Sequence, residues 1–354
     1  MSDENTSATS VDDPAVRNPD LDFFRRVAWA ALTTEPPVDP ERRIVDSHHH
    51  LWQQGGWKYR IADYARDAAT GHNITSTVFI ECQGSYRQSG PDELRPVGET
   101  EFVAAEARQA AGRDPHVAAL VAHADLALGD GVEAVLAAHE TAGDGLFRGI
   151  RHMTTWSADP NPHAHTGAGV DPALLSRYDF RRALARLGDM GYSFDAFVFH
   201  SQLPELADAT RAVEGTTFIL DHLGAPMLGT ASDHDRVEIR AQWRAGMRDV
   251  AKCENVVVKL GALGMDGMFG TGWSSRERPP DSDEVAAWWG DDIRFCIDTF
   301  GPGHCMFESN YPIDRESLGY GVIWNAFQKI ARAYTDAEQD QLFAGTAERV
   351  YRLA

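Results

Sequence analysis

Short apolar runs alternate with amphipathic stretches along the chain from Arg43 onward. Runs rich in β-branched and aromatic residues predict eight strands, at Ile44–Ser47, Ser76–Cys82, Val117–His123, Phe147–Arg151, Ser193–His200, Thr217–Asp221, Val256–Leu260 and Cys305–Ser309. Helical periodicity between them predicts helices at Glu99–Ala111, Gly131–Ala142, Phe180–Met190, Leu203–Val213, Arg240–Lys252, Glu284–Thr299 and Leu318–Tyr334. Strands that alternate with helices form parallel βα units. Eight such units predict an α/β fold, a single-domain (β/α)8 TIM barrel over residues 43–354.

The first 42 residues lack this alternation. Residues 1–20 are polar, acidic and without periodicity, which predicts a disordered tail. Residues 21–42 predict a lead-in to the barrel, with a short helix over Asp22–Leu32 followed by a Pro-rich segment. Neither GxGxxG nor GxxxxGK[ST] follows any predicted strand, so the sequence lacks the main motifs of a nucleotide-binding fold.

Charge and cysteine usage narrow the class of partner. The chain has 33 Lys and Arg against 53 Asp and Glu, a formal net charge of −20, which argues against a nucleic-acid or anionic-membrane partner. Its four cysteines form no CxxC, which predicts a reduced, cytoplasmic protein. No apolar run approaches the ~18 residues of a membrane helix, and no signal peptide is recognised. We therefore expect a small-molecule partner.

Histidines stand at the ends of three predicted strands. In a (β/α)8 barrel the active site lies at the carboxyl ends of the strands. His48 and His50 are two residues apart and face the same side, while His200 and His222 end the fifth and sixth strands. A single histidine of this kind is more often a packing residue, but four at strand ends indicate a site for a divalent ion such as Zn2+ or Mn2+.

These histidines belong to a wider pattern. The HxH of His48 and His50, the single His200 and His222, LDHLGAP around His222, and MFESNYP on the last strand together resemble the amidohydrolase superfamily. More narrowly, they are similar to its amidohydrolase-related branch of lactonases and decarboxylases, over residues 43–354. The resemblance implies a TIM-barrel hydrolase, often with one divalent metal and often homo-oligomeric, that acts on lactones or similar cyclic esters.

Asn310 departs from the family pattern, in which an Asp at this position binds metal and moves the proton of the attacking water. A carboxamide cannot act as a general base near neutral pH and is a poor ligand. Asn310 would then orient water or substrate while another group takes the proton; alternatively the enzyme works without metal, or its chemistry is lost or different. Glu308, two residues earlier on the same side, and Glu81, near the end of the second strand, are the candidate carboxylates. For Glu81 the alternative is a buried ion pair with an arginine.

Substrate-binding candidates follow other strands. Arg151 ends the fourth strand and suits a carboxylate or a developing oxyanion; His152 follows it. Lys259 on the seventh strand either faces the site or forms a buried ion pair. Tyr86 and Arg87, in the loop after the second strand, are candidates for a polar pocket wall.

Three functions remain open at this point. In the first, a metal held by His48, His50, His200 and Glu81, or a metal-free histidine site, activates water to open a carboxylated or ring-bearing lactone, with His222, Glu308 and Asn310 as catalytic residues. In the second, the same scaffold is a metal-dependent decarboxylase of an aromatic acid. In the third, a catalytically altered barrel binds a small ligand, which Asn310 alone supports.

Overall fold

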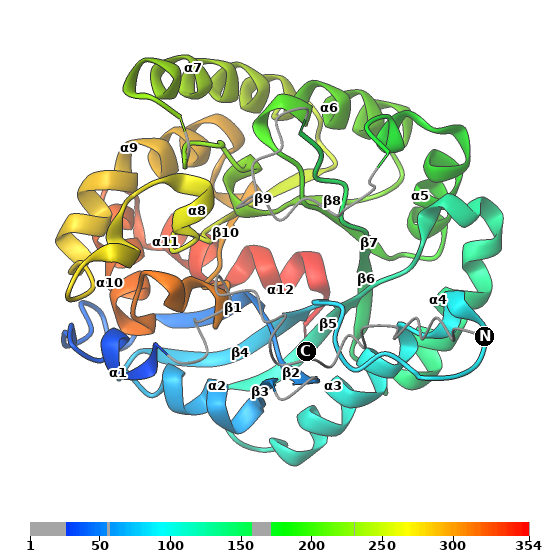
Figure 1. The fold of residues 1–354 in the computed structure, drawn as a ribbon, viewed down its shortest axis with the longest axis horizontal. Coiled ribbons are helices and arrows are strands. Elements are labelled where there is room, and N and C mark those ends of the chain that lie inside the picture. The colour runs from blue at the N-terminus through cyan, green and yellow to red at the C-terminus, as the bar shows by residue number, and fades with distance from the viewer. Residues whose placement is uncertain (1–25, 55–56, 158–170, 230, 354) are drawn as a thin grey trace, which may run out of the picture.

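The computed structural model describes residues 26–54, 57–157, 171–229 and 231–353 (Figure 1). The tail predicted at 1–20 lies outside these ranges. Eight parallel strands form one sheet, each hydrogen-bonded to the next in the order β1 (Arg43–His49), β4 (Asn73–Ile80), β5 (His116–Ala122), β6 (Phe147–Arg151), β7 (Ser193–Ala196), β8 (Phe218–Leu220), β9 (Val256–Leu260) and β10 (Cys305–Phe307). A parallel bridge between His49 and Tyr311 joins the two ends. The predicted TIM barrel is confirmed.

Helices surround the sheet on its outer face (Figure 1). Their bounds are α1 (Val27–Ala30), α2 (Ile61–Ala68), α3 (Val97–Gln109), α4 (Val132–Ala142), α5 (Tyr178–Asp189), α6 (Leu203–Ala212), α7 (Asp233–Val250), α8 (Asp266–Phe269), α9 (Ser282–Phe300), α10 (Tyr320–Ala331), α11 (Asp336–Asp340) and α12 (Thr346–Tyr351). Outward strand residues such as Phe79, Leu120 and Phe218 are buried in one apolar cluster with these helices. Within the described ranges, no helix combines the length and apolar character that crossing a bilayer requires.

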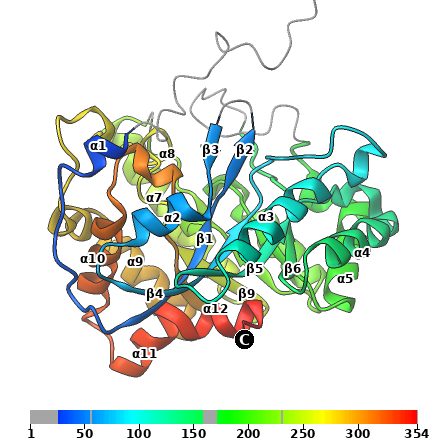
Figure 2. The same ribbon diagram turned by 90° about the horizontal axis from the view of Figure 1, so that it is seen from below.

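The two ends of the barrel differ. Inward-facing Val45, Val121, Ile219 and Met306 form an apolar cluster with Tyr351 of α12. Figure 2 shows α12 at this end and the small antiparallel hairpin of β2 (Trp52–Gln54) and β3 (Trp57–Tyr59) at the opposite one. Because the apolar cluster closes one end, polar chemistry is confined to the carboxyl ends of the strands.

Several element bounds differ from the sequence-based prediction. Strand β7 ends at Ala196, so His200 lies four residues beyond it, in a 3-10 turn. Helix α7 begins seven residues earlier than predicted, because the Ser232 side chain accepts a hydrogen bond from the backbone N of Asp235 and caps its first turn. The sequence pattern missed α2 and the β2–β3 hairpin, since both are too short to display a clear period.

Candidate active site

The HxH segment at the end of β1 turns two of its three imidazoles into the barrel. The register with β4 shifts between Asp46 and His49. His48 and His50 approach each other, with 3.2 Å between their Nε2 atoms. His49 instead points outward, its Nδ1 lying 3.0 Å from the carbonyl oxygen of Val78. The predicted side of each histidine is therefore confirmed.

Glu308 follows β10 and bridges two imidazoles. Its Oε1 lies 2.8 Å from Nδ1 of His222, and its Oε2 lies 2.8 Å from Nδ1 of His48. A carboxylate only accepts hydrogen bonds, so Nδ1 of His222 carries the hydrogen and its Nε2 keeps a lone pair when the ring is neutral. Oε2 of Glu308 makes no hydrogen bond among the described residues, and Nδ1 of His48 also lies 3.2 Å from Nζ of Lys259, which only donates, so Glu308 does not fix the tautomer of His48. Burial, followed by the nearby Lys259 charge, lowers the pKa of His48 well below its usual range, so this ring is neutral near pH 7.

Gly261 provides the space for this carboxylate. A Cβ on Gly261 would lie 2.3 Å from Cγ of Glu308 and 2.2 Å from its carbonyl oxygen. Neither distance is compatible with a side chain larger than hydrogen. The glycine directly after β9 therefore allows the backbone and side chain of Glu308 to approach the neighbouring strand closely.

Asn310 directs its amide oxygen at the HxH pair. Its Nδ2 donates to Oδ1 of Asp314 at 2.9 Å, which turns Oδ1 to within 3.2 Å of Nε2 of His50. Since Nδ1 of His50 donates to the carbonyl of Ile80 at 2.8 Å, Nε2 of His50 is also an acceptor in the neutral ring. The acceptors of His50 and Asn310 thus face each other across 3.2 Å, and their lone pairs repel one another unless a proton or a cation lies between them.

Arg151 at the end of β6 contacts the same centre. Its Nε donates to Oε1 of Glu81 at 2.8 Å, and its Nη2 donates to the carbonyl of Glu81. Its Nη1 lies 3.3 Å from Nε2 of His48 and 3.5 Å from Oδ2 of Asp221. Burial alone would lower the pKa of Arg151, but Glu81 and Asp221 outweigh it and raise the pKa. The guanidinium is therefore charged and held on several sides.

Lys259 on β9 is fully buried beneath the imidazoles. Its Nζ lies 2.6 Å from Oδ2 of Asp195 and 3.0 Å from Oδ1 of Asp221, closer than the 3.2 Å to Nδ1 of His48. Burial raises the pKa of Asp195 to about 6, whereas at Asp221 the charges of Lys259, His222 and Arg151 together outweigh burial and lower the pKa. The ammonium is thus neutralised mainly by the carboxylates rather than by His48.

The donor set fits a divalent metal ion. Ligand atoms of His48, Asp221 and His222 all lie within 4.8 Å of one another, and all three residues are buried. The acceptors of His50 and Asn310 join His48 from the other side. Imidazole nitrogens with a carboxylate are typical of zinc and manganese sites. Four carboxyl groups also face two cations in this centre, namely Glu81, Asp195, Asp221 and Glu308 against Arg151 and Lys259, so negative charge remains for a dication to balance.

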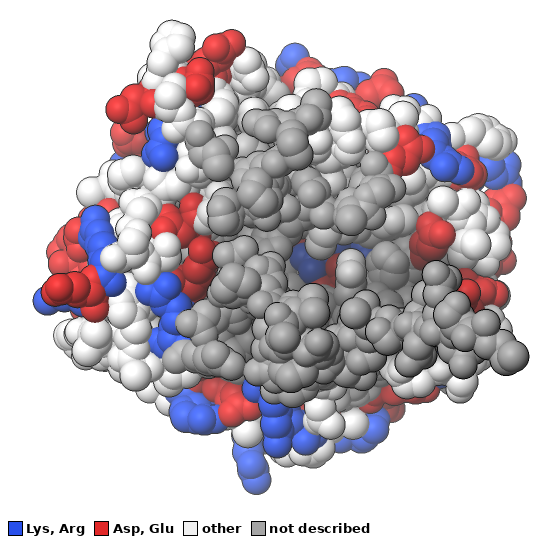
Figure 3. Space-filling view, in the orientation of Figure 1, with Lys and Arg blue, Asp and Glu red and all other residues white. Residues whose placement is uncertain are grey.

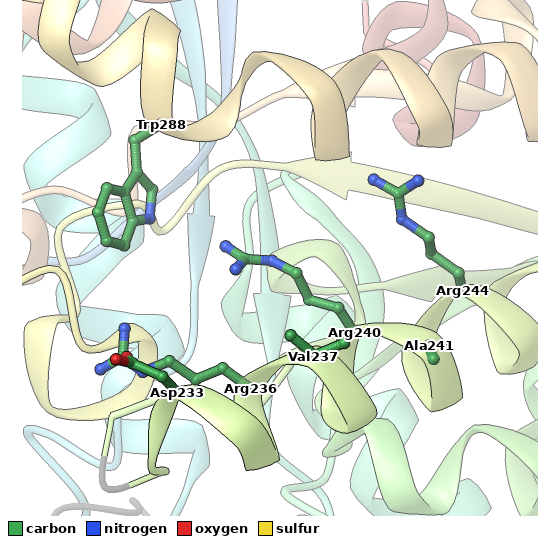
Figure 4. A pocket seen from close by; sticks show the side chains of 7 residues that line it. All are labelled: Asp233, Arg236, Val237, Arg240, Ala241, Arg244 and Trp288. Atoms are coloured by element: carbon green, nitrogen blue, oxygen red, sulfur yellow. The ribbon is translucent and has the colours of Figure 1, made fainter.

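The mouth above these residues is hollowed, and Figure 3 shows basic and acidic side chains at the bottom of the hollow. A second groove, of about 500 Å3, lies on the outer helix layer between α7 and α9 (Figure 4). It is lined by Arg236, Arg240, Arg244 and Trp288, and two of these arginines pair with Asp292 of α9. This outer groove contains no imidazole among its lining residues, so the barrel mouth is the candidate active site.

Comparison with known proteins agrees with this geometry. A family model described as amidohydrolase matches residues 45–353. The chain belongs to the amidohydrolase family. An L-fucono-1,5-lactonase from Burkholderia multivorans is 30% identical over 326 residues, which cover 87% of this chain and 96% of that protein. A crystal structure of an amidohydrolase from Burkholderia multivorans with bound zinc is 25% identical, with a TM-score of 0.61, and covers 88% of this chain and 99% of that chain.

A more distant structure shares the fold alone. It is a putative 2-pyrone-4,6-dicarboxylic acid hydrolase from Pseudomonas putida, 16% identical, with a TM-score of 0.61. The match covers 88% of this chain and 98% of that chain.

The remaining predicted site residues of this amidohydrolase lie around the centre rather than in it. Nδ1 of His200 accepts a hydrogen bond from the backbone N of Met227 at 3.3 Å, and no contact of His200 with the central imidazoles is seen among the described residues. Glu81 lies beside Arg151 as a buried ion pair, the alternative weighed for it. Arg87 pairs with Glu101 of α3. Tyr86 and His152 face a further histidine, His123.

Sequence reasoning missed three members of this amidohydrolase site. Asp221 and Asp195 hold Lys259, and His123 directly follows β5. Strand alternation carried a signal for both aspartates, because each lies on the inward face of its strand. His123 ends the predicted third strand, and its position at a carboxyl strand end matches that of His48.

Proposed function

We propose that this amidohydrolase opens a lactone with water to give a hydroxy acid. The observation that carries the proposal is the hydrogen bond between Glu308 and Nδ1 of His222, because Nε2 of His222 is then an acceptor in the neutral ring at the open end of the barrel. The 30% identity to an L-fucono-1,5-lactonase supports a sugar-type lactone as the substrate.

His222 is the proposed proton acceptor. Its Nε2 takes a proton from water as the water oxygen bonds to the carbonyl carbon, and Glu308 on Nδ1 stabilises the imidazolium that forms. The ring C–O bond then breaks, and the same proton goes to the departing alkoxide. Glu308 acts through His222 and is a positioning residue, so the chemistry does not require a carboxylate at Asn310.

Asn310 and Arg151 assist without moving the proton. The amide oxygen of Asn310, fixed by Asp314, accepts a hydrogen bond and orients the water. Arg151 keeps its charge next to His48 Nε2 and stabilises the negative charge that develops on the carbonyl oxygen. His200 presents Nε2–H when neutral, because its Nδ1 accepts from the backbone, so it suits a hydrogen bond to substrate better than a metal.

His48 and His50 are the residues that would hold Zn2+ or Mn2+, with Asp221 as the carboxylate ligand and Asn310 as a weaker ligand. A bound dication would polarise the lactone carbonyl and lower the pKa of water. The alternative is a metal-free centre, in which Arg151 supplies the positive charge near the same Nε2 atom of His48.

The test combines elemental analysis of the purified protein with a pH-stat assay on a lactone panel. His222→Asn keeps a donor for Glu308 but no proton acceptor, so we expect a loss of kcat of at least about 100-fold with unchanged metal content. Protein that opens no lactone but releases carbon dioxide from hydroxybenzoates would show the decarboxylase instead. Protein that does neither would show a ligand-binding barrel.

A further inference from the structure

A second group of polar rings lies beside the Glu308 centre. Tyr86 follows β4, His123 follows β5 and His152 follows β6, so all three lie at the carboxyl ends of neighbouring strands. The rings of Tyr86 and His123 are 6.4 Å apart and nearly parallel, and those of His123 and His152 are 5.2 Å apart. His152 is adjacent in sequence to Arg151, and Nδ1 of His123 lies 3.2 Å from the carbonyl oxygen of Arg151. The group therefore borders the reacting centre.

Fixed backbone partners determine what each imidazole offers. The carbonyl of Arg151 only accepts, so His123 carries its hydrogen on Nδ1, and its Nε2 is an acceptor in the neutral ring. His152 shows the opposite arrangement, since its Nδ1 accepts from the backbone N of Leu126 at 3.2 Å and its Nε2 carries the hydrogen. Burial, followed by the charge of His123, lowers the pKa of His152 to about 4, so this ring is a neutral donor near pH 7.

Two buried oxygens next to these rings lack hydrogen bonds. The hydroxyl of Tyr86 and Oε2 of Glu81 have no hydrogen-bond partner among the described residues. Buried polar atoms without a partner are costly, and in an enzyme mouth they are satisfied by ligand or water. With His123 as acceptor and His152 as donor, the group presents both polarities, which is what hydroxyl groups require.

The cations expected to bind a substrate carboxylate are already paired. Arg151 pairs with Glu81 and Asp221, Lys259 with Asp195 and Asp221, and Arg87 with Glu101. Three carboxyl groups, Glu81, Asp195 and Asp221, surround the two buried cations, so a substrate carboxylate would be repelled and the mouth favours a neutral ring.

We propose that Tyr86, His123 and His152 form a specificity subsite that binds hydroxyl groups of a neutral, polyhydroxylated lactone. This inference rests on the proposed lactone hydrolysis and deepens it. The three residues do not touch the reacting carbonyl. They select the substrate by its hydroxyl pattern and hold its ring beside Arg151.

The variants remove Nε2 of each imidazole while keeping a polar group at the position of Nδ1. His123→Asn and His152→Asn place an amide where Nδ1 stands, so they can keep the backbone hydrogen bond while losing Nε2. Tyr86→Phe removes only the hydroxyl. The matched control is His123→Gln, whose amide lies near the Nε2 position and therefore retains part of the substrate contact.

The substrates are a panel of stereoisomeric hexono-1,5-lactones, and δ-valerolactone, which has the same ring without hydroxyls. We expect each Asn or Phe variant to raise KM for the best hexonolactone about three- to tenfold. For δ-valerolactone, kcat/KM should stay within about twofold. His123→Gln should fall between wild type and His123→Asn. An equal loss of kcat/KM on both substrate types, or no loss on the hexonolactone, would overturn the subsite. A glucaro-1,4-lactone carries a carboxylate, and its faster reaction than any neutral lactone would also overturn it.

Calorimetry with D-glucono-1,5-lactam, a neutral ring that is not hydrolysed, separates the two proposals. If the wild type opens no lactone but binds the lactam, and the His123→Asn variant does not, the hydrolysis proposal fails and the subsite stands. If the wild type opens δ-valerolactone but neither binds the lactam nor opens any hexonolactone, the subsite fails and hydrolysis stands. Neither binding nor hydrolysis would overturn both.

Discussion

Replacing Glu308 with glutamine tests how two imidazoles share one carboxylate. In the native protein Oε1 of Glu308 accepts a hydrogen bond from Nδ1 of His222 at 2.8 Å, and Oε2 lies 2.8 Å from Nδ1 of His48. A glutamine side chain has one acceptor oxygen and one donor NH2. One imidazole must therefore lose its bond or move its hydrogen from Nδ1 to Nε2. If His222 changes, the proton acceptor is lost; if His48 changes, its lone pair toward His50 is lost.

The size of the effect follows from these contacts. A charge-assisted hydrogen bond contributes about 1.5–3 kcal/mol, and a positioned general base contributes about 10²- to 10⁴-fold in rate. We therefore expect Glu308→Gln to lower kcat by about 10²- to 10⁴-fold, equivalent to about 3–5 kcal/mol of activation free energy. KM should change less than about threefold, because Glu308 does not touch the substrate.

The assay is pH-stat titration of the acid released, with kcat followed from pH 5 to 9. A carboxylate beside an imidazole raises its pKa, so the acidic limb of the kcat profile should move to lower pH in Glu308→Gln, which a purely structural role would not cause. The matched control is Glu106→Gln on α3, a carboxylate that is also buried but pairs with Arg60 in the outer layer. Its kcat should stay within about twofold of wild type. If Glu308→Gln keeps kcat within threefold and leaves the profile unmoved, the bridge has no catalytic role.

Three further predictions follow from neighbouring contacts. Gly261→Ala should displace Glu308, because the new Cβ would meet its Cγ at 2.3 Å, and lower kcat at least tenfold at unchanged far-UV circular dichroism; full kcat would contradict this. Burial, with repulsion from Glu81, raises the pKa of Glu99 to about 8. The folded state therefore retains a proton that the unfolded state loses, so the free energy of unfolding should fall by up to about 1.4 kcal/mol per pH unit between about pH 5 and 8, relative to Glu99→Gln. Urea titrations at stepped pH measure this, and equal slopes would count against it. Chelation should remove metal from the wild type and lower its Tm, with recovery on adding Zn2+ or Mn2+, and His50→Ala should reduce the metal content; an unchanged Tm and metal-free native protein would favour the Arg151 alternative.

The architecture was accessible from local patterns. Eight apolar runs separated by amphipathic helices predict parallel βα units, and the two-residue spacing put His48 and His50 on one side of the chain and His49 on the other. That the pair faces the barrel interior depends on the register shift between Asp46 and His49, because Val45 faces inward as well. The predicted strand end at His200 is wrong for a physical reason. The apolar run continues past Ala196, but the chain leaves the sheet there, and an apolar segment buried in a loop looks the same as one buried in a strand.

The sequence by itself determined which nearby residues share one side of a strand, such as His48 and His50, because side chains two residues apart point the same way. It did not determine which of those residues are partners. Lys259 and Asp195 are 64 residues apart, Arg151 and Glu81 are 70 apart, and His222 and Glu308 are 86 apart. Such contacts depend on the stagger between strands and on close approaches such as that of Glu308 to Gly261. The periodicity of the sequence contains no information on either. The tertiary structure therefore decided that Glu308 lies between two histidines and that Arg151 and Lys259 each pair with buried carboxylates.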